Sequence, residues 1–366
     1  MGLREGALED LVSPWKGRRV FLTGHTGFKG SWLALWLARK GAQVRGFAID
    51  PDTEPNLFTT ASVGGFIEDE RGDIRNHASL QASLTGFAPE VVFHLAAQPL
   101  VRRSYVDPLG TYATNVMGTA HVLEAVRKCS SVRAVVCVTT DKCYQNQEWV
   151  WPFRETDQLG GHDPYASSKA CAEIVSAAYR SSFFPADRIH EHQVALATAR
   201  AGNVIGGGDW SEDRLIPDLI RGFQSGKPVL IRAPKAIRPW QHVLDPLHGY
   251  LMLAERLLGR KAQFSSSFNF GPAEGDSWPV MKIASGVASI WGVGASWASS
   301  EAEGVHEART LRIDTSKARA ELGWWPRLGI EGALKWAIDW YKAWEAGANM
   351  REETQAQITA YERLCS

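Results

Sequence analysis

The sequence predicts an α/β fold, a doubly wound parallel sheet with helices on both faces, followed by a smaller C-terminal α/β lobe. Three observations in the first half predict it. Short β-rich runs alternate with helical stretches, these runs show little polar alternation, and a glycine-rich turn follows the first run. Strands that are buried on both faces have this continuous apolar character. We expect residues 1–200 to form the sheet domain.

Five runs rich in Val, Phe and Leu are the predicted strands, at Arg18–Thr23, Gln43–Ile49, Val91–Ala96, Arg133–Thr139 and Val194–Arg200. The segments between them are predicted helices. One of these, Tyr165–Tyr179, carries many small side chains: Ala166, Ser167, Ser168, Ala170, Ala172, Ala177 and Ala178. We expect an antiparallel helix to pack closely against it, from this chain or from a second subunit.

Beyond Arg200, prolines and glycines separate shorter elements, and no further regular βα units are evident. We assign residues 201–366 mainly to the smaller lobe, with part of this segment returning to the sheet. Near the end, one helical face holds Leu334, Ala337, Ile338 and Tyr341, and a second stripe holds Trp336, Trp340 and Trp344. Core packing is the expected role of both stripes, rather than ligand binding.

Composition narrows the class of protein. The 366 residues are 45% hydrophobic, with 40 basic and 40 acidic side chains, which excludes disordered, collagen-like and coiled-coil chains. A net charge of zero gives no general attraction to nucleic acid or membrane, so we expect a small-molecule partner. No apolar run approaches the roughly 18 residues that span a bilayer, and the charged residues 1–10 do not resemble a signal peptide. The five cysteines lack zinc-ligand spacing, so we expect a reduced, cytoplasmic compartment and no metal site.

A glycine-rich loop follows the first predicted strand and leads into a helix; it consists of Gly24, His25, Thr26, Gly27, Phe28, Lys29 and Gly30. Such a turn presents backbone N–H groups and a helix N-terminus to a pyrophosphate. Asp50 ends the second strand, where an acid hydrogen-bonds the ribose 2′-hydroxyl of NAD and repels the phosphate of NADP. Arg45 is the one nearby cation that suits a 2′-phosphate instead. A purely structural turn with an exposed acid is the alternative.

The same edge of the sheet gathers further candidate NAD contacts, two of them between the strands Gln43–Ile49 and Val91–Ala96 and three at the end of Val91–Ala96: Asp73, Ile74, Leu95, Ala96 and Ala97. Tyr165 and Lys169 are four residues apart, hence on one face of a helix. A charged lysine beside a tyrosine favours the phenolate, which accepts a proton from a substrate hydroxyl. The pair follows a strand that ends in Thr139-Thr140-Asp141-Lys142. Without this context, a surface pair is the alternative.

With these motifs the chain resembles the extended short-chain dehydrogenase/reductases, which have a Rossmann-type sheet, and among them the CDP-glucose 4,6-dehydratase family. The resemblance runs from about Trp15 to about Pro326. It rests on the segments Thr23–Gly30, His94–Val101, Thr139–Tyr144, Tyr165–Lys169, Ala201–Trp210 and Arg238–Val243. The glycine loop as spelled here, Thr-Asp-Lys and Arg-Pro-Trp-Gln-His-Val are its most specific parts.

The resemblance implies internal redox chemistry on CDP-glucose with NAD, followed by loss of water across C5 and C6. It implies that Tyr165, assisted by Lys169, takes the C4 hydroxyl proton, and that Thr140 hydrogen-bonds the same oxygen. Asp141 is the candidate acid at C6, provided that it stays protonated until used. Similar dTDP-sugar dehydratases carry a glutamate base at the position of Lys142. We hypothesise that neutral Lys142 removes the C5 proton; the alternative is that it only holds Asp141.

For the substrate, the resemblance implies diphosphate contacts from Asn203, Arg238, Asn269 and Arg309, and nucleoside contacts from Arg214, Leu215 and Ile231. For each of these side chains, a purely structural role is the alternative to substrate binding. A homodimer formed through two helices per subunit, one of them carrying Tyr165, is also implied. Two other functions are retained: a different nucleotide-sugar 4,6-dehydratase or 4-epimerase of the same superfamily, and a non-catalytic NAD-binding protein.

Overall fold

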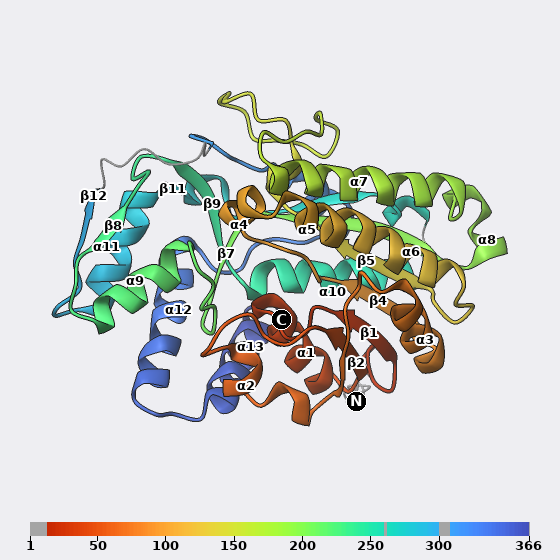
Figure 1. Ribbon diagram of the computed structural model, residues 1–366, viewed down its shortest axis with the longest axis horizontal. Helices are drawn as coiled ribbons and strands as arrows, with labels where there is room; N and C mark the ends of the chain where they lie inside the picture. The colour runs from red at the N-terminus through yellow and green to blue at the C-terminus, as the bar shows by residue number, and fades with distance from the viewer. Residues whose placement is uncertain (1–12, 260–261, 300–307, 366) are drawn as a thin grey trace, which may run out of the picture.

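The computed structural model describes residues 13–259, 262–299 and 308–365 (Figure 1). The charged N-terminal stretch considered above, residues 1–10, lies outside the described residues. A seven-stranded sheet of parallel strands forms the centre of the molecule. Its spatial order is β10 (Ser267–Phe270), β6 (Ala195–Ala201), β5 (Ala134–Val138), β4 (Val91–His94), β1 (Arg19–Thr23), β2 (Gln43–Ala48) and β3 (Glu68–Arg71).

Helices cover both faces of this sheet (Figure 1). One face carries α1 (Phe28–Arg39), α10 (Leu244–Leu258) and α13 (Met350–Cys365), and the other carries α3 (His77–Phe87), α6 (Gly118–Arg127) and α7 (Pro164–Ser182). Short helices connect these layers: α2 (Leu57–Thr60), α4 (Val101–Val106), α5 (Pro108–Tyr112) and α8 (Ile189–His192). Single turns lie at Val63–Gly65, Ala113–Met117, Asp141–Cys143 (η3), Ala186–Arg188, Ala262–Phe264, Glu274–Asp276 and Ala318–Leu322.

The central strands β1, β4 and β5 are largely apolar because both of their faces are buried, whereas the edge strand β3 is charged and mostly exposed. In β1, Val20 and Leu22 pack into the cluster that contains Trp32 of α1. Phe21, between them, packs into the opposite cluster with Leu84 of α3. Successive strand residues point to opposite faces, so neither face can be polar. The predicted doubly wound parallel sheet is confirmed, with strand limits within three residues of those expected.

The smaller lobe stands beside the carboxyl end of the sheet (Figure 1). It contains two small sheets, β11-β9-β7 and β12-β8, with three helices. Their bounds are β7 (Asn203–Ile205), β8 (Val229–Ile231), β9 (Ile237–His242), β11 (Ser277–Pro279), β12 (Trp297–Ser299), α9 (Leu215–Gln224), α11 (Val280–Trp291) and α12 (Ile330–Glu345). Strand β10 also comes from the second half of the chain, yet it pairs with β6 in the large sheet.

Two helices show how well periodicity predicts packing. On α12, Leu334, Ala337, Ile338 and Tyr341 are buried as expected, and Trp340 between them is fully buried as well. On α7, the small-sided face is largely covered by this chain itself: Ala166, Ser168, Ala170 and Ala172 are buried within the single subunit. The small residues therefore first serve packing inside the subunit, because α5, α6 and the turn η3 approach α7 there.

The described residues contain no cluster of ligands suited to a metal ion, and their five cysteines are unpaired. In residues 13–259, 262–299 and 308–365, no helix has both the length and the apolar character needed to cross a bilayer.

Candidate active site

A cavity of about 980 Å³ opens at the carboxyl edge of the sheet, against the smaller lobe. Its walls combine residues from both halves of the chain. Those predicted from sequence that line it are Lys29, Leu95, Ala97, Thr140, Lys142, Tyr165, Lys169, Asn203, Arg214, Leu215, Ile231 and Arg238. In open α/β sheets, ligands bind at this edge, and the volume suits a nucleotide sugar beside a nicotinamide.

The glycine loop has the shape of a diphosphate cradle. Gly24 has φ +79°, and a Cβ there would lie 2.6 Å from the backbone nitrogen of Ala96. A Cβ on Gly30 would lie 2.0 Å from the carbonyl oxygen of Gly24, so both positions require glycine. Gly27 caps the N-terminus of α1, and a Cβ there would meet only the Gly24 oxygen, at 3.5 Å. The loop thus leaves its backbone open to a ligand, and these residues fit a dinucleotide.

The side chains of the loop mostly face inward. His25 is buried with Nε2 2.8 Å from Asp69, so any cofactor contact from His25 runs through its backbone. Thr26 donates to the carbonyl of Ile49 at 3.0 Å. Phe28 lies against Gly206, where an added Cβ would meet its ring at 3.1 Å.

The ribose and adenine end of the predicted cofactor site is more open. The Asp50 side chain is 88% exposed, 3.6 Å from Arg71, two residues beyond the end of β2. Arg45 is paired with Glu68 at 2.6 Å, so its guanidinium is already engaged and is poorly placed for a 2′-phosphate. The side chain of Asp73 bonds Arg75, which lowers the pKa of that carboxyl. Ile74 is buried, in contact distance of Gly118.

Lys29 of the glycine loop contributes its side chain to the cavity. It is the second residue of α1 and lies next to the backbone cradle. Burial lowers the pKa of Lys29 to about 7, helped by the cations Arg214 and Lys169 and opposed by Asp141. The sequence predicts Lys29 as a cofactor contact, and the structure adds that its side chain lines the cavity.

Tyr165 and Lys169 lie on one face of α7, and both line the cavity. Burial raises the pKa of Tyr165 to about 12, while a hydrogen bond with Thr140 and the charge of Arg214 act in the opposite direction. In the ligand-free protein, desolvation outweighs the nearby cations, so the predicted support of the phenolate by Lys169 remains a prediction for the occupied site. Burial also lowers the pKa of Lys169 to about 8, and its Nζ lies 3.5 Å from the carbonyl of Val138.

Asp141 and Lys142 occupy the turn η3 just beyond β5. Thr140 Oγ1 donates to Asp141 Oδ1 at 3.0 Å, and Lys142 Nζ is 3.9 Å from the same oxygen. Asp141 is 1% exposed, and its Oδ2 has no hydrogen-bond partner among the described residues. This oxygen lies immediately behind the cavity wall: a Cβ on Gly202 would be 3.2 Å from it. Lys142 lines the cavity directly and is half-buried.

Five of the seven predicted substrate residues line the cavity, and Oδ1 of Asn203 is buried there without a partner among the described residues. Asn269 is the exception that needs correction. Its amide donates to the carbonyls of Phe153 and Asp314, both at 3.0 Å, and accepts from Tyr144, so it has no free group for a diphosphate. It is fully buried because β10 belongs to the large sheet.

Arg309 lies next to Ala308, which is at the cavity wall, but Arg309 itself is outside the lining. Its backbone N–H donates to Glu148 at 2.8 Å, and the other Glu148 oxygen accepts from the N–H of Thr310 at 3.0 Å. Glu148 lines the cavity and holds this segment over it. Nothing in the sequence indicated Glu148, because 161 residues separate it from its partner.

Comparisons with known proteins agree with this geometry. Residues 20–266 match the family described as the NAD dependent epimerase/dehydratase family. A CDP-glucose 4,6-dehydratase of Salmonella typhimurium is 50% identical over 95% of this chain and 97% of its own length. A dTDP-glucose 4,6-dehydratase of Xanthomonas campestris pv. campestris is 26% identical over 87% of this chain and 92% of its own length.

Among solved structures, MoeE5 in complex with UDP-glucose and NAD is similar, with a TM-score of 0.74 and 26% identity, over 88% of this chain and 98% of that one. The dTDP-glucose 4,6-dehydratase of Bacillus anthracis in complex with NAD shares the fold at a TM-score of 0.74 and 22% identity, over 92% of this chain and 100% of that one. By the extent of these matches, the chain belongs to the NAD dependent epimerase/dehydratase family.

Proposed function

We propose that this protein is an NAD-dependent CDP-glucose 4,6-dehydratase, which converts CDP-D-glucose to CDP-4-dehydro-6-deoxy-D-glucose and water. The observation that carries the proposal is one cavity walled by the Tyr165–Lys169 pair, by Thr140 and Lys142, and by Lys29 of the glycine loop, with Asp141 just behind the wall. Half of all residues are identical to a CDP-glucose 4,6-dehydratase over nearly the whole chain, which supports the choice of nucleotide.

The cofactor is assigned to the backbone cradle of Gly24, Gly27 and Gly30, with Asp50 at the ribose and Asp73 at the adenine end. Held there, NAD⁺ would supply the acceptor for the hydride from C4 and the donor of the same hydride to C6. Tyr165 takes the proton of the C4 hydroxyl, and Thr140 holds that oxygen in place. Because burial raises the pKa of Tyr165 to about 12, proton transfer near pH 7 depends on the positive charge that Lys169 provides.

Loss of water needs a base at C5 and an acid at C6, since hydroxide is a poor leaving group. In our proposal, Asp141 donates the proton to the departing C6 oxygen through Oδ2, which lacks a protein partner among the described residues. Lys142, directly at the cavity wall, removes the C5 proton. A 4-epimerase has no use for this acid and base, which is why we favour a dehydratase.

For the nucleotide, we propose that Asn203 and Arg238 bind the diphosphate and that Arg214, Leu215 and Ile231 surround the nucleoside. Arg214 lies 3.1 Å from Asp209, which fixes its guanidinium at the wall. Arg238 suits the diphosphate because arginine forms bidentate hydrogen bonds with phosphate oxygens. Arg309 remains a candidate for the diphosphate from the edge of the site, and Asn269 is withdrawn from this set.

Incubation with CDP-, dTDP-, UDP- and GDP-glucose in turn tests the function. We expect the alkali-induced absorbance of a 4-keto-6-deoxy sugar with CDP-glucose, and at least about tenfold slower turnover with the other three. Formation of CDP-galactose without this absorbance would identify an epimerase. Binding of NAD without turnover of any of the four sugars would favour a non-catalytic protein.

We also propose a cytoplasmic homodimer. Five unpaired cysteines suit a reducing compartment. Large apolar side chains are exposed on α5, α7 and the segments beside them: Val106, Leu109, Met117 and Ile174. The two helices are adjacent, because Tyr112 Oη lies 2.6 Å from Ser167 Oγ. An exposed apolar surface of this kind favours association of two copies.

A further inference from the structure

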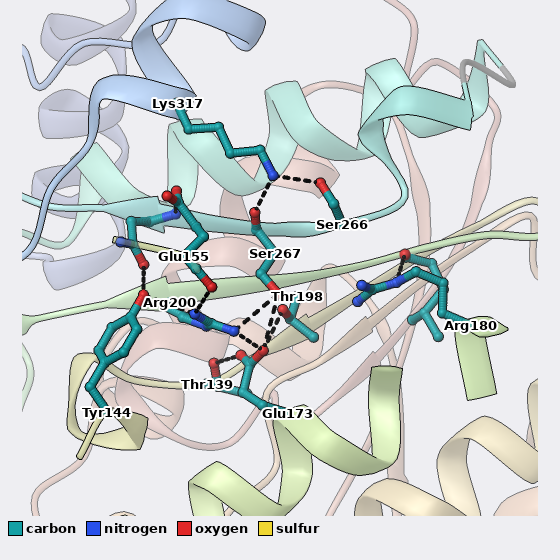
Figure 2. A network of polar contacts seen from close by, with 12 residues as sticks. Thr139, Tyr144, Glu155, Glu173, Arg180, Thr198, Arg200, Ser266, Ser267 and Lys317 are labelled. Atoms are coloured by element: carbon teal, nitrogen blue, oxygen red, sulfur yellow. Dashed lines mark hydrogen bonds and ion pairs between the residues drawn. The ribbon is translucent and has the colours of Figure 1, made fainter. Parts of the chain in front are cut away.

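Glu173 and Arg200 form an ion pair that is almost completely buried below the cavity (Figure 2). Their side chains are 2% and 3% exposed, and Arg200 Nη2 lies 2.7 Å from Glu173 Oε2. Burial of such a pair costs desolvation energy that its own attraction often only balances. No step proposed above uses either residue, so the placement of this pair needs another explanation.

The position of Glu173 on α7 gives the first part of that explanation. Tyr165, Lys169 and Glu173 follow one another at intervals of four residues, so they share one face of the helix. All three side chains are buried. Glu173 therefore lies one turn below the ammonium of Lys169 and two turns below the phenol of Tyr165.

Hydrogen bonds connect Glu173 to β6 and to the end of β5, which leads into the turn η3 (Figure 2). The hydroxyl of Thr139 donates to Oε1, and the hydroxyl of Thr198 donates to Oε2 at 2.8 Å. Thr139 directly precedes Thr140. The carboxylate thus fixes the end of β5 at the residue before the proposed catalytic segment.

Arg200 holds the other end of the same segment. Its Nη1 donates to the hydroxyl of Tyr144 at 2.8 Å, and Tyr144 in turn donates to Asn269 at 2.7 Å. Tyr144 directly follows η3. The turn with Thr140, Asp141 and Lys142 is therefore held at both ends by the two members of one buried ion pair.

The charges around Lys169 give the second part of the explanation. The titratable groups that face it belong to α1, β4, β5, η3 and α7, and they are Lys29, His94, Cys137, Cys143, Tyr165 and Glu173. Burial raises the pKa of Tyr165 to about 12, so this phenol is neutral near pH 7 in the ligand-free protein. Burial raises the pKa of Cys137 to about 12 and the pKa of Cys143 well above its usual value. Burial, with the charge of Lys169, lowers the pKa of His94 to about 3. These three groups are therefore neutral near pH 7.

Among the groups from the described residues that face Lys169, Glu173 is then the one that carries negative charge. Burial by itself raises the pKa of Glu173, but Arg200, Thr139 and Thr198 more than compensate, and its pKa is lowered overall. The carboxylate is therefore ionised near pH 7. Its charge raises the pKa of Lys169, one turn away, and so counteracts the lowering of that pKa by desolvation.

We propose that Glu173, paired with Arg200, is a positioning residue for catalysis, which keeps Lys169 in its charged form and holds the segment Thr140–Lys142 in register with Tyr165. This inference rests on the function proposed above, since it assigns Lys169 the support of the Tyr165 phenolate. It also makes a statement about Lys169 in the ligand-free protein, which is independent of any substrate.

Glu173→Gln tests the electrostatic part, because glutamine has the shape of glutamate without its charge. In the ligand-free protein, we expect the titration of Lys169, followed by the ¹³C signal of its Cε, to move down by about one pH unit. Lys169→Met assigns the signal. With CDP-glucose, kcat should fall about tenfold while KM changes less than about twofold, and the alkaline limb of the kcat profile, where Lys169 loses its proton, should move to lower pH.

Glu155→Gln is the matched control. Glu155 is a half-buried acid of the same polar network, since it accepts the backbone N–H of Asn269 at 2.8 Å, but it is not among the groups that shift Lys169. This variant should lose stability without moving the Lys169 titration or the pH profile. If Glu173→Gln behaves in the same way as Glu155→Gln, the Glu173–Arg200 pair is only structural and the proposal is wrong.

Two more variants cover the remaining cases. Glu173→Gln leaves Arg200 buried without its partner, so the chain could fail to fold. The double variant Glu173→Gln/Arg200→Met removes both charges, and it should fold and still show a lowered Lys169 titration. An unchanged titration in the folded double variant would overturn the electrostatic part. Thr139→Val keeps the carboxylate of Glu173 and removes its hydrogen bond at the end of β5. This variant should lower kcat a few-fold without moving the pH profile. A wild-type kcat would overturn the claim that Glu173 holds the segment Thr140–Lys142 in register.

Failure of the inference can be separated from failure of the proposed function. The Lys169 titration needs no substrate and no cofactor. If the protein does not convert CDP-glucose, a Lys169 titration that moves in Glu173→Gln still supports the role of Glu173. If it does convert CDP-glucose and the titration does not move, the function stands and this inference falls.

Discussion

Lys142 decides how the C5 proton leaves the sugar in our proposal. Lys142→Met should lower dehydration about 100-fold or more, because it removes the base while the methionine fills the same space. Oxidation at C4 should continue, since Tyr165, Lys169 and Thr140 are unchanged. The check is exchange of the C5 hydrogen with deuterated solvent alongside product formation. Unchanged exchange and turnover would show that Lys142 only holds Asp141, from which it is 3.9 Å away.

Lys29 offers a test of cofactor binding that needs no turnover. The pKa of Lys29 is lowered to about 7 by burial, so at pH 8 much of the free protein has a neutral lysine there. A dinucleotide diphosphate favours the charged form, so binding at pH 8 should take up protons. Calorimetry of NAD binding in two buffers of different ionisation enthalpy measures this uptake.

Lys29→Met should abolish that proton uptake and weaken NAD binding about tenfold. Lys142→Met is the control, because it removes a cavity-lining lysine outside the glycine loop and should bind NAD with proton uptake intact. Equal proton uptake in Lys29→Met and wild type would exclude Lys29 from the diphosphate site.

Among the helices, α13 is held to α10 by one buried carboxyl group. Asp245 Oδ1 accepts the hydroxyl of Tyr361 and the backbone N–H of Arg327, both at 2.7 Å, while Oδ2 is without a partner among the described residues. Burial raises the pKa of Asp245 to about 6, although these hydrogen bonds act against it. Ionisation of Asp245 therefore destabilises the folded state.

The sign of the resulting pH dependence follows from linkage. Because the folded pKa lies above the unfolded value, the folded protein holds the proton more tightly, and this contribution to stability is lost as pH rises from about 4 to 6. Asp245→Asn does not ionise. Relative to wild type, its free energy of unfolding should therefore gain about 2 kcal/mol between pH 4 and pH 7. Urea unfolding at both pH values measures the difference, and a constant difference would contradict the assignment.

In the whole molecule, the exposed apolar surface of α5 and α7 is the feature that predicts assembly. Ile174 is 56% exposed at the centre of α7, away from the cavity-lining face with Tyr165 and Lys169. Ile174→Glu should convert a dimer to a monomer, because burial of a carboxylate in an apolar interface is costly. Light scattering coupled to gel filtration reports the mass. Leu364→Glu, on α13 and also exposed, should leave the mass at that of two chains.

The site was predictable from sequence where its chemistry is local. Tyr165 and Lys169 share a helix face because four residues make about one turn, and the structure places both at the cavity. Gly24 and Gly30 are required by backbone contacts within the loop and with the adjacent strand end. Asn269 was misplaced because its surroundings depend on β10, a strand that crosses back from the second half of the chain to pair with β6.

Hydrophobic periodicity, glycine-dependent backbone shape and residue spacing act over a few neighbours, which is why the chain alone specifies its α/β class, its dinucleotide loop and its Tyr-Lys pair. Burial and charge act between residues that are distant in sequence and adjacent in space. Packing of one half of the chain against the other sets the pKa values of Lys29 and Tyr165. The same packing forms the Glu173–Arg200 ion pair and the contact of Glu148 with residues 309 and 310. Only the folded arrangement sets the desolvation and the neighbouring charges on which these properties depend.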